Sequence, residues 1–149
     1  MTADVIELPS LSDALVLTRA RYPTIDAFGV RPYRGEFNRA EMPREAGPFE
    51  INGREYGTAA AFFALCMPAK KSPRPGLNSY HIKHIIESWC RAHGNPQYIA
   101  NGAAIVAPVA LGFPTWRDEA RDSPNVSIGI RRRLWQTMIA DALREPATR

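Results

Sequence analysis

The sequence lacks the marks of a secreted or membrane-spanning protein. Its 149 residues include only two cysteines, Cys66 and Cys90, and both lie in apolar helical patterns typical of reduced, buried thiols inside cells. The first nine residues contain Asp4 and Glu7 and no apolar run, so we expect no signal peptide. The longest apolar stretch, 99–113, is too short to span a bilayer. We therefore expect a soluble, cytoplasmic protein.

The sequence also lacks the short motifs of common catalytic and cofactor sites. Its glycines do not take the spacing of a phosphate-binding loop or a dinucleotide fingerprint, and there is no nucleophile elbow or metalloprotease motif. We predict no cofactor. A helix-turn-helix built from 79–93 and 99–111 is excluded too, because the segment 103–111 has no polar side chain to read base edges.

The spacing of three histidines and one cysteine resembles that of a zinc site, but helical geometry argues against it. His81 and His84 lie about 60° apart on a helical wheel, whereas Cys90 and His93 lie roughly 120° to 180° from them. Four ligands on one helix therefore cannot converge, although the first pair could bind a metal with help from elsewhere. We predict no metal, and a half-buried core position for His93.

The apolar pattern predicts a mostly helical α+β protein. The chain is 45% hydrophobic and long enough for a single domain over residues 1–149. Periodicity and capping residues predict helices at 11–21, 59–67, 79–93, 99–111 and 132–144. The helices at 79–93 and 99–111 would form a central antiparallel pair beside a small β-hairpin or sheet.

Turn residues and prolines predict the remaining segments. Asn52-Gly53, within an alternating stretch at 49–56, favours a two-residue hairpin in which Glu50 faces Glu55. Residues 125–130 alternate as a strand does. Prolines and glycines without a period predict a long irregular segment at about 22–48, and 69–76 reads as a basic, extended loop.

Charge is distributed unevenly along the chain. Residues 1–60 hold seven Lys or Arg against nine Asp or Glu, and residues 61–149 hold twelve against six, so the halves carry about −2 and +6 of the net +4. Two clusters stand out, Lys70, Lys71 and Arg74, and Arg131, Arg132 and Arg133. Such clusters attract phosphate or an acidic protein surface. Alternatively, the arginines extend into water or pair with Asp118, Glu119 and Asp122.

The helix predicted at 79–93 carries a polar stripe opposite its apolar face. The stripe consists of Tyr80, Lys83, His84, Glu87 and Arg91, spaced three or four residues apart so that neighbours can touch. The simplest interpretation is a solvated face with weak salt bridges. The alternative is a site in which Glu87 orients His84 as a base, with Asn101 beside it.

Part of this region resembles a known group of proteins. Ser79-Tyr80-x-x-Lys83-His84-x-x-Glu87, followed by Tyr98-Ile99-x-Asn101-Gly102 and Leu111-Gly112-Phe113, resembles short uncharacterised proteins of bacterial phages and other mobile elements. The resemblance covers about a quarter of the chain. It implies a genetic context and no catalytic residue.

Two functional hypotheses follow. The first is a non-catalytic binding protein whose basic clusters engage an anionic partner, either nucleic acid or an acidic protein surface. The second is a small enzyme that uses the polar stripe of 80–91. An enzyme needs that stripe inside a pocket, whereas a binding protein leaves it on an open surface.

Overall fold

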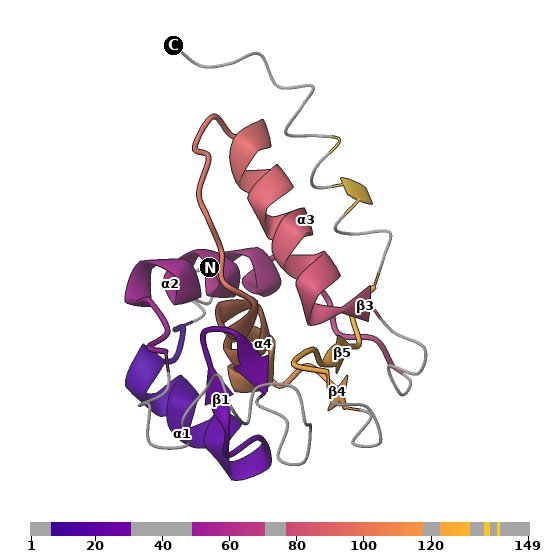
Figure 1. Cartoon of the computed structure of the whole chain (residues 1–149). Coiled ribbons are helices and arrows are strands. Elements are labelled where there is room, and N and C mark those ends of the chain that lie inside the picture. The colour runs from indigo at the N-terminus through magenta and orange to yellow at the C-terminus, as the bar shows by residue number, and fades with distance from the viewer. Residues whose placement is uncertain are drawn as a thin grey trace.

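The computed structural model describes residues 7–30, 49–70, 77–117, 123–131, 136, 137 and 140 (Figure 1). The elements within this part of the chain are α1 (Leu11–Arg21), β1 (Ile25–Asp26), β2 (Gly29–Val30), α2 (Gly53–Ala64), β3 (Leu77–Asn78), α3 (Ser79–Ala92), α4 (Asn101–Ala110), β4 (Thr115–Trp116) and β5 (Ser127–Ile128). The predicted α+β class is confirmed.

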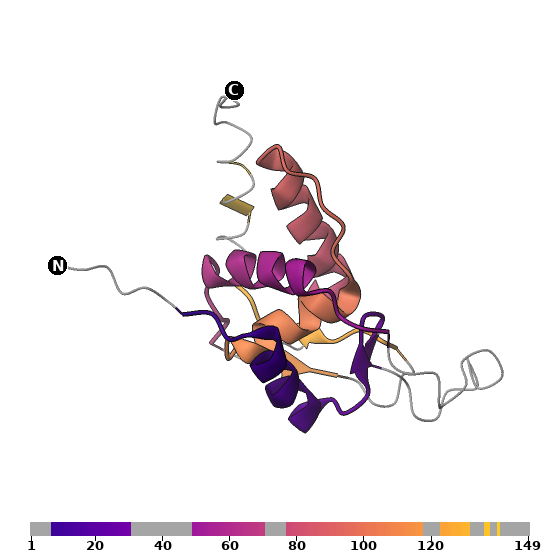
Figure 2. The ribbon, with the colours of Figure 1, turned by 90° about the vertical axis from the view of Figure 1, so that its left-hand side faces the viewer.

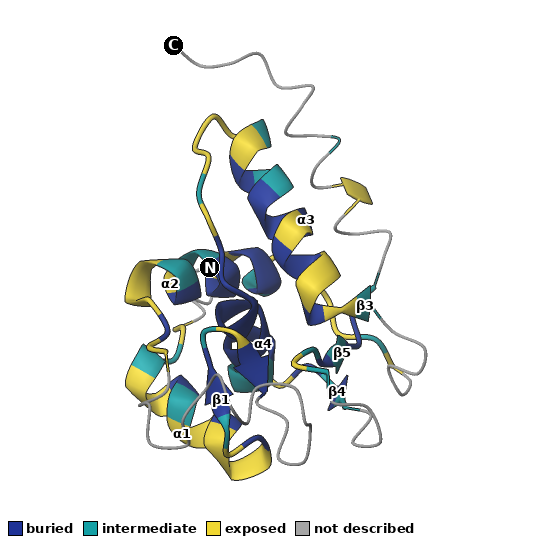
Figure 3. Ribbon diagram, viewed as in Figure 1, coloured by how far each residue is buried: buried dark blue, intermediate teal, exposed yellow. Residues whose placement is uncertain are grey.

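Helix α4 is the core of the molecule. Every residue from Asn101 to Pro108 is buried, as expected of a helix that is apolar on nearly all sides. It packs against α1, α2, α3 and β2. In Figures 1 and 2 it lies between α2 and α1, and Figure 3 shows it as the most uniformly buried helix. The other helices each turn one face toward it.

Helix α3 begins and ends where its capping residues predict. The Asn78 side chain accepts a hydrogen bond from the backbone N–H of His81, and Gly94 takes the left-handed conformation after the helix, with φ of 73°. The isoleucines of the predicted apolar face, Ile82, Ile85 and Ile86, are buried. The predicted half-buried position of His93 is wrong. This residue is exposed because α3 extends past α2 and α4, and its ring stacks on the edge of Trp89.

The predicted hairpin at Asn52-Gly53 is wrong, because these residues begin helix α2. The Asn52 side chain accepts hydrogen bonds from the N–H groups of Arg54 and Glu55, at 2.9 and 3.1 Å. Asparagine suits helix N-caps as well as tight turns, and here the helical period that follows decides between them. The predicted pair of Glu50 and Glu55 does not form. Instead Glu55 accepts a hydrogen bond from the N–H of Ala100 at 2.6 Å.

The helix predicted at 59–67 therefore begins and ends earlier, as α2 at Gly53–Ala64. Its Phe62 and Phe63 side chains are buried, as expected. Leu65 and Met67, which the sequence assigned to the core, lie beyond the helix and are about half exposed. They leave the helical register before Pro68, so they no longer face α4.

The strands form two small antiparallel sheets. β1 pairs with β2 within the segment predicted to be irregular, and residues 31–48 of that segment lie outside the described residues. The second sheet has the order β3-β5-β4 and pairs Ile128 with both Leu77 and Thr115. The predicted strand at 125–130 is confirmed in its central part, β5.

A close contact joins the β1–β2 hairpin to α4. The N–H of Gly102 donates to the carbonyl oxygen of Ala27 at 2.9 Å. A Cβ atom at Gly102 would overlap the carbonyl of Asp26, so no larger residue fits here without a backbone shift. The hairpin position is thus fixed by a glycine in the core helix.

Two further expectations concern membrane insertion and the chain end. None of the helices in the described ranges has the length and apolar character needed to cross a membrane. Most of the helix predicted at 132–144 lies outside the described residues, as do Lys71, Arg74, Arg132 and Arg133.

Candidate functional site

Glu87 organises a compact polar cluster on α3. Its Oε2 atom lies 3.1 Å from Lys83 Nζ, and its Oε1 atom lies 3.0 Å from His84 Nδ1. The same Oε2 accepts a hydrogen bond from the backbone N–H of Ile99 at 3.1 Å. We call Tyr80, Lys83, His84, Glu87 and Tyr98 the Glu87 cluster. The predicted contact between Glu87 and His84 is confirmed.

The Glu87 cluster is not the solvated stripe that the simplest interpretation predicted. Lys83 is 6% exposed and Glu87 is 8% exposed. The connection from α3 to α4 runs back along the helix (Figure 1), and its Tyr98 and Ile99 contact Lys83 and Glu87. Lys83 Nζ lies 4.7 Å from the ring centre of Tyr98 and 5.7 Å from that of Tyr80. The ammonium group thus exchanges water for a carboxylate and two aromatic faces.

Hydrogen bonds keep Glu87 charged in spite of its burial. Burial alone would raise the pKa of Glu87, but the hydrogen bonds from Ile99, Lys83 and His84 and the Lys83 charge lower the pKa below its ordinary value. An ionised carboxylate only accepts hydrogen bonds, so His84 donates through Nδ1–H. Its Nε2 is then the nitrogen left for other contacts, on a side chain that is 51% exposed.

The other predicted stripe residues divide between the cluster and separate positions. The Tyr80 ring meets the His84 ring edge to face, with centroids 4.7 Å apart. Arg91 is exposed and donates to Ser88 Oγ. Asn101 holds other parts of the fold, because its Nδ2 donates to the carbonyl oxygen of Phe28 and to Asn125 Oδ1. Arg91 and Asn101 therefore make their contacts away from His84.

Backbone pairing joins the segments that carry Lys70 and Arg131, the two residues of the basic clusters that the structure describes. Pro68 forms an antiparallel bridge with Ile130. The N–H of Ala69 donates to the Gly129 carbonyl oxygen, and the N–H of Arg131 donates to the Met67 carbonyl oxygen. Lys70 and Arg131 are 61 positions apart in the sequence, yet they flank the same short bridge. Neither hydropathy nor charge pattern predicts this pairing.

Two more arginines join the same sheet. Arg21 Nη2 donates to the carbonyl oxygen of Thr115 in β4 at 2.5 Å. Arg117, just after β4, donates to the carbonyl oxygen of Ser123 at 3.0 Å. We call the β3-β5-β4 sheet with Lys70, Arg131, Arg21 and Arg117 the basic sheet. Within the ranges 67–70, 77–78, 113–117 and 123–131 there is no Asp or Glu.

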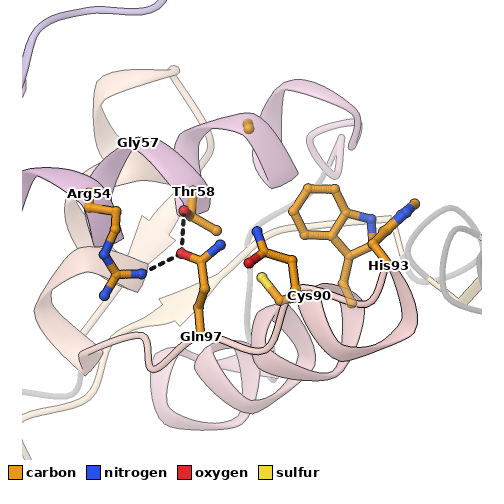
Figure 4. A pocket seen from close by; sticks show the side chains of 9 residues that line it. Arg54, Gly57, Thr58, Cys90, His93 and Gln97 are labelled. Atoms are coloured by element: carbon orange, nitrogen blue, oxygen red, sulfur yellow. Dashed lines mark hydrogen bonds between the residues drawn. The ribbon is translucent and has the colours of Figure 1, made fainter. Parts of the chain in front are cut away.

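A hollow that the sequence did not predict lies between α2 and the C-terminal half of α3 (Figure 4). Its volume is about 440 Å³. The lining includes Arg54, Thr58, Trp89, Cys90, His93 and Gln97, and none of the Glu87 cluster. Arg54 and Thr58 both donate to Gln97 Oε1, at 2.6 and 3.0 Å. The four-residue spacing of Arg54 and Thr58 places both on one face of a helix. The sequence did not predict this face, because it predicted a hairpin at Asn52-Gly53.

Both cysteines are buried, and they form no disulfide. Burial raises the pKa of Cys66 to about 12. Burial, followed by the charge of Glu87, also raises the pKa of Cys90. A thiol with a raised pKa is a poor nucleophile and a poor metal ligand at neutral pH. In the described part of the chain, no group of three or more His, Cys, Asp or Glu side chains could hold a metal ion.

Comparison of this chain with protein-family models, curated proteins and solved structures gave no match. Its function must therefore be inferred from its own residues.

Proposed function

We propose that this protein is a non-catalytic binding protein that engages an anionic macromolecule through the basic sheet. We place it in the cytoplasm and in a mobile-element setting. The partner is a nucleic acid or an acidic protein surface. The observation that supports this proposal is the bridge between 67–69 and 129–131, which joins the segments next to Lys70 and Arg131 at one end of the β3-β5-β4 sheet.

The charge of this sheet favours an anionic partner. Lys70 and Arg21 are exposed, and Arg117 and Arg131 are partly exposed. Arg21 and Arg117 donate hydrogen bonds to backbone carbonyl oxygens. These acceptors are neutral, so they do not neutralise the arginine charges. Cations gathered in this way raise the local potential and draw phosphates or carboxylates to the surface. The proposal includes the remaining residues of the two basic clusters, Lys71, Arg74, Arg132 and Arg133, which lie outside the described residues.

The alternative, a small enzyme built on the polar stripe, has less support. Lys83 is buried and paired, Arg91 faces solvent, and Asn101 bonds to other segments. Of the stripe residues, Tyr80 and His84 present accessible acid or base groups, and both are about half exposed. Acid–base catalysis needs a substrate held against such a group, usually within a concave site. The hollow described above is lined by other residues.

The test is a binding measurement on two variants of equal net charge. Lys70→Gln/Arg131→Gln removes two cations from the basic sheet. Arg91→Glu lowers the charge by the same two units, and Arg91 lies about 20 Å along α3 from Asn78 in β3. The probes are single-stranded and double-stranded oligonucleotides and poly-glutamate, with binding followed by fluorescence anisotropy.

We expect the wild type to bind at least one of these polyanions, and the basic-sheet variant to bind it about tenfold more weakly. A tenfold change corresponds to about 1.4 kcal/mol, a modest loss for two phosphate or carboxylate contacts. The Arg91→Glu protein should bind as the wild type does. Absence of wild-type binding to every polyanion, or equal loss in both variants, would contradict the proposal. Binding to poly-glutamate alone would identify an acidic protein as the partner class.

A further inference from the structure

We propose that the hollow between α2 and α3 binds a small molecule that joins a carboxylate to a flat apolar group. This site is independent of the basic sheet. Its volume of about 440 Å³ falls in the usual range for small-ligand sites. Two features of its lining point to a ligand of this class, a set of hydrogen-bond donors at one side and an apolar wall at the other.

The donors are Arg54 and Gln97. The Gln97 amide oxygen accepts from both Arg54 Nη1 and Thr58 Oγ1, so this orientation of the amide is fixed by two donors. The amide nitrogen of Gln97 must then point the other way, and Figure 4 shows it directed toward the middle of the hollow. The Gln97 N–H groups and the remaining donors of the Arg54 guanidinium both line the hollow, so an anionic ligand there finds donors from two side chains.

The charge of the hollow calls for an anion. Arg54 lies in the first turn of α2, where the positive end of the helix dipole disfavours a cation. The lining contains no Asp or Glu, and within the described residues the hydrogen bond of Arg54 is to a neutral amide. A carboxylate fits because arginine binds its two oxygens in parallel, with hydrogen bonds stronger than those of neutral pairs.

The apolar wall of the hollow determines which group can accompany the carboxylate in the ligand. Trp89 is partly exposed and its ring meets Phe62 on one side and His93 on another, with centroids 5.5 and 5.3 Å away. Cys90 and Ala61 add further apolar lining, and the raised pKa of the Cys90 thiol keeps it uncharged. A flat apolar group placed against this indole would bury aromatic surface while its carboxylate reaches Arg54.

The experiment uses benzoate as the probe and benzamide as its uncharged counterpart. Both are titrated into the ¹⁵N-labelled full chain, and NMR follows the Trp89 indole N–H and the side-chain amides of Asn95 and Gln97. We expect saturable shifts with benzoate in the millimolar range, and binding at least tenfold weaker with benzamide. Equal binding of the two compounds, or no saturable shift with benzoate, would overturn the proposal.

Two variants and a control separate binding from folding. Gln97→Glu keeps an acceptor for Arg54 and Thr58 but places a negative charge in the hollow, so it should abolish benzoate binding without unfolding the protein. Arg54→Gln should weaken binding about tenfold. Arg91→Gln removes one charge outside the lining and should bind as the wild type does. Wild-type affinity in Gln97→Glu, with an unchanged thermal melt, would show that benzoate binds elsewhere and refute the site.

Discussion

At the scale of single residues, the contacts of Glu87 show what helical spacing can predict and what it cannot. Spacing along a helix is sufficient to predict that Lys83, His84 and Glu87 can touch, and they do. The sequence could not predict that two of them are buried, because the connection from α3 to α4 is held by a contact between Glu87 and Ile99, twelve positions away. Local periodicity carries no information about such a contact. The sequence likewise could not predict the contact between Arg54 and Gln97, because these residues are 43 positions apart.

Replacing Glu87 with Gln should strongly destabilise the fold. The amide would leave the buried Lys83 ammonium without a countercharge and weaken the hydrogen bond to the N–H of Ile99. Breaking a buried pair in this way costs about 3 kcal/mol in the free energy of unfolding. Arg91→Gln, an exposed change on the same helix, should cost less than about 0.5 kcal/mol. Urea unfolding at neutral pH measures both, and similar values for the two variants would contradict the burial of the pair.

The contribution of Glu87 should also depend on pH. Its pKa in the folded protein is below the ordinary value of 4.5, so the native state holds this proton less tightly than the unfolded state does. The stabilisation is therefore fully present above that ordinary value and is lost as the pH falls through the lowered, folded pKa. We expect the difference in unfolding free energy between wild type and Glu87→Gln to shrink in that acidic window. A constant difference would refute the charged state of Glu87.

At the scale of elements, capping residues predict two helix starts correctly and one wrongly. Asn78 and Ser10 cap α3 and α1, and the Ser10 side chain accepts from the N–H of Asp13. Thr58, the cap expected for the helix at 59–67, lies inside α2 instead. Asn52 suits both a hairpin turn and a helix N-cap. The alternation at 49–56 favours the hairpin, whereas the apolar residues that follow at helical spacing favour the helix. Two-residue strands such as β1 and β4 are too short to show a period, so their pairing could not be predicted.

Two glycines in helices provide a matched test of how the elements pack. Gly102→Ala should destabilise the protein by about 2 kcal/mol or more, because the added methyl group meets the Asp26 carbonyl and forces the hairpin away from α4. Gly57→Ala, with open space around the added atom, should stabilise α2 by up to about 1 kcal/mol. Thermal and urea unfolding measure both changes. Tolerance of alanine at Gly102 would contradict the close contact between α4 and the hairpin.

At the scale of the whole molecule, the sequence predicted the α+β class and the buried, central place of the helix at 99–111, whereas the helix at 79–93 turns one face to solvent. The two basic clusters are separate in the sequence. In the fold, a bridge between Pro68 and Ile130 joins the segments next to Lys70 and Arg131. Long-range pairing of this kind depends on the packing of the entire core around α4. The case for an anionic partner is therefore stronger with the fold in hand than from composition alone.

The salt dependence of polyanion binding tests this account most directly. For a duplex oligonucleotide, the slope of log affinity against log salt concentration is about −0.9 per phosphate contact. Lys70→Gln/Arg131→Gln should therefore flatten the slope by about 1.8, whereas Arg91→Glu should leave it unchanged. Identical slopes for the wild type and the basic-sheet variant would show that Lys70 and Arg131 contact no phosphate, and would contradict the basic sheet as the nucleic-acid-binding surface.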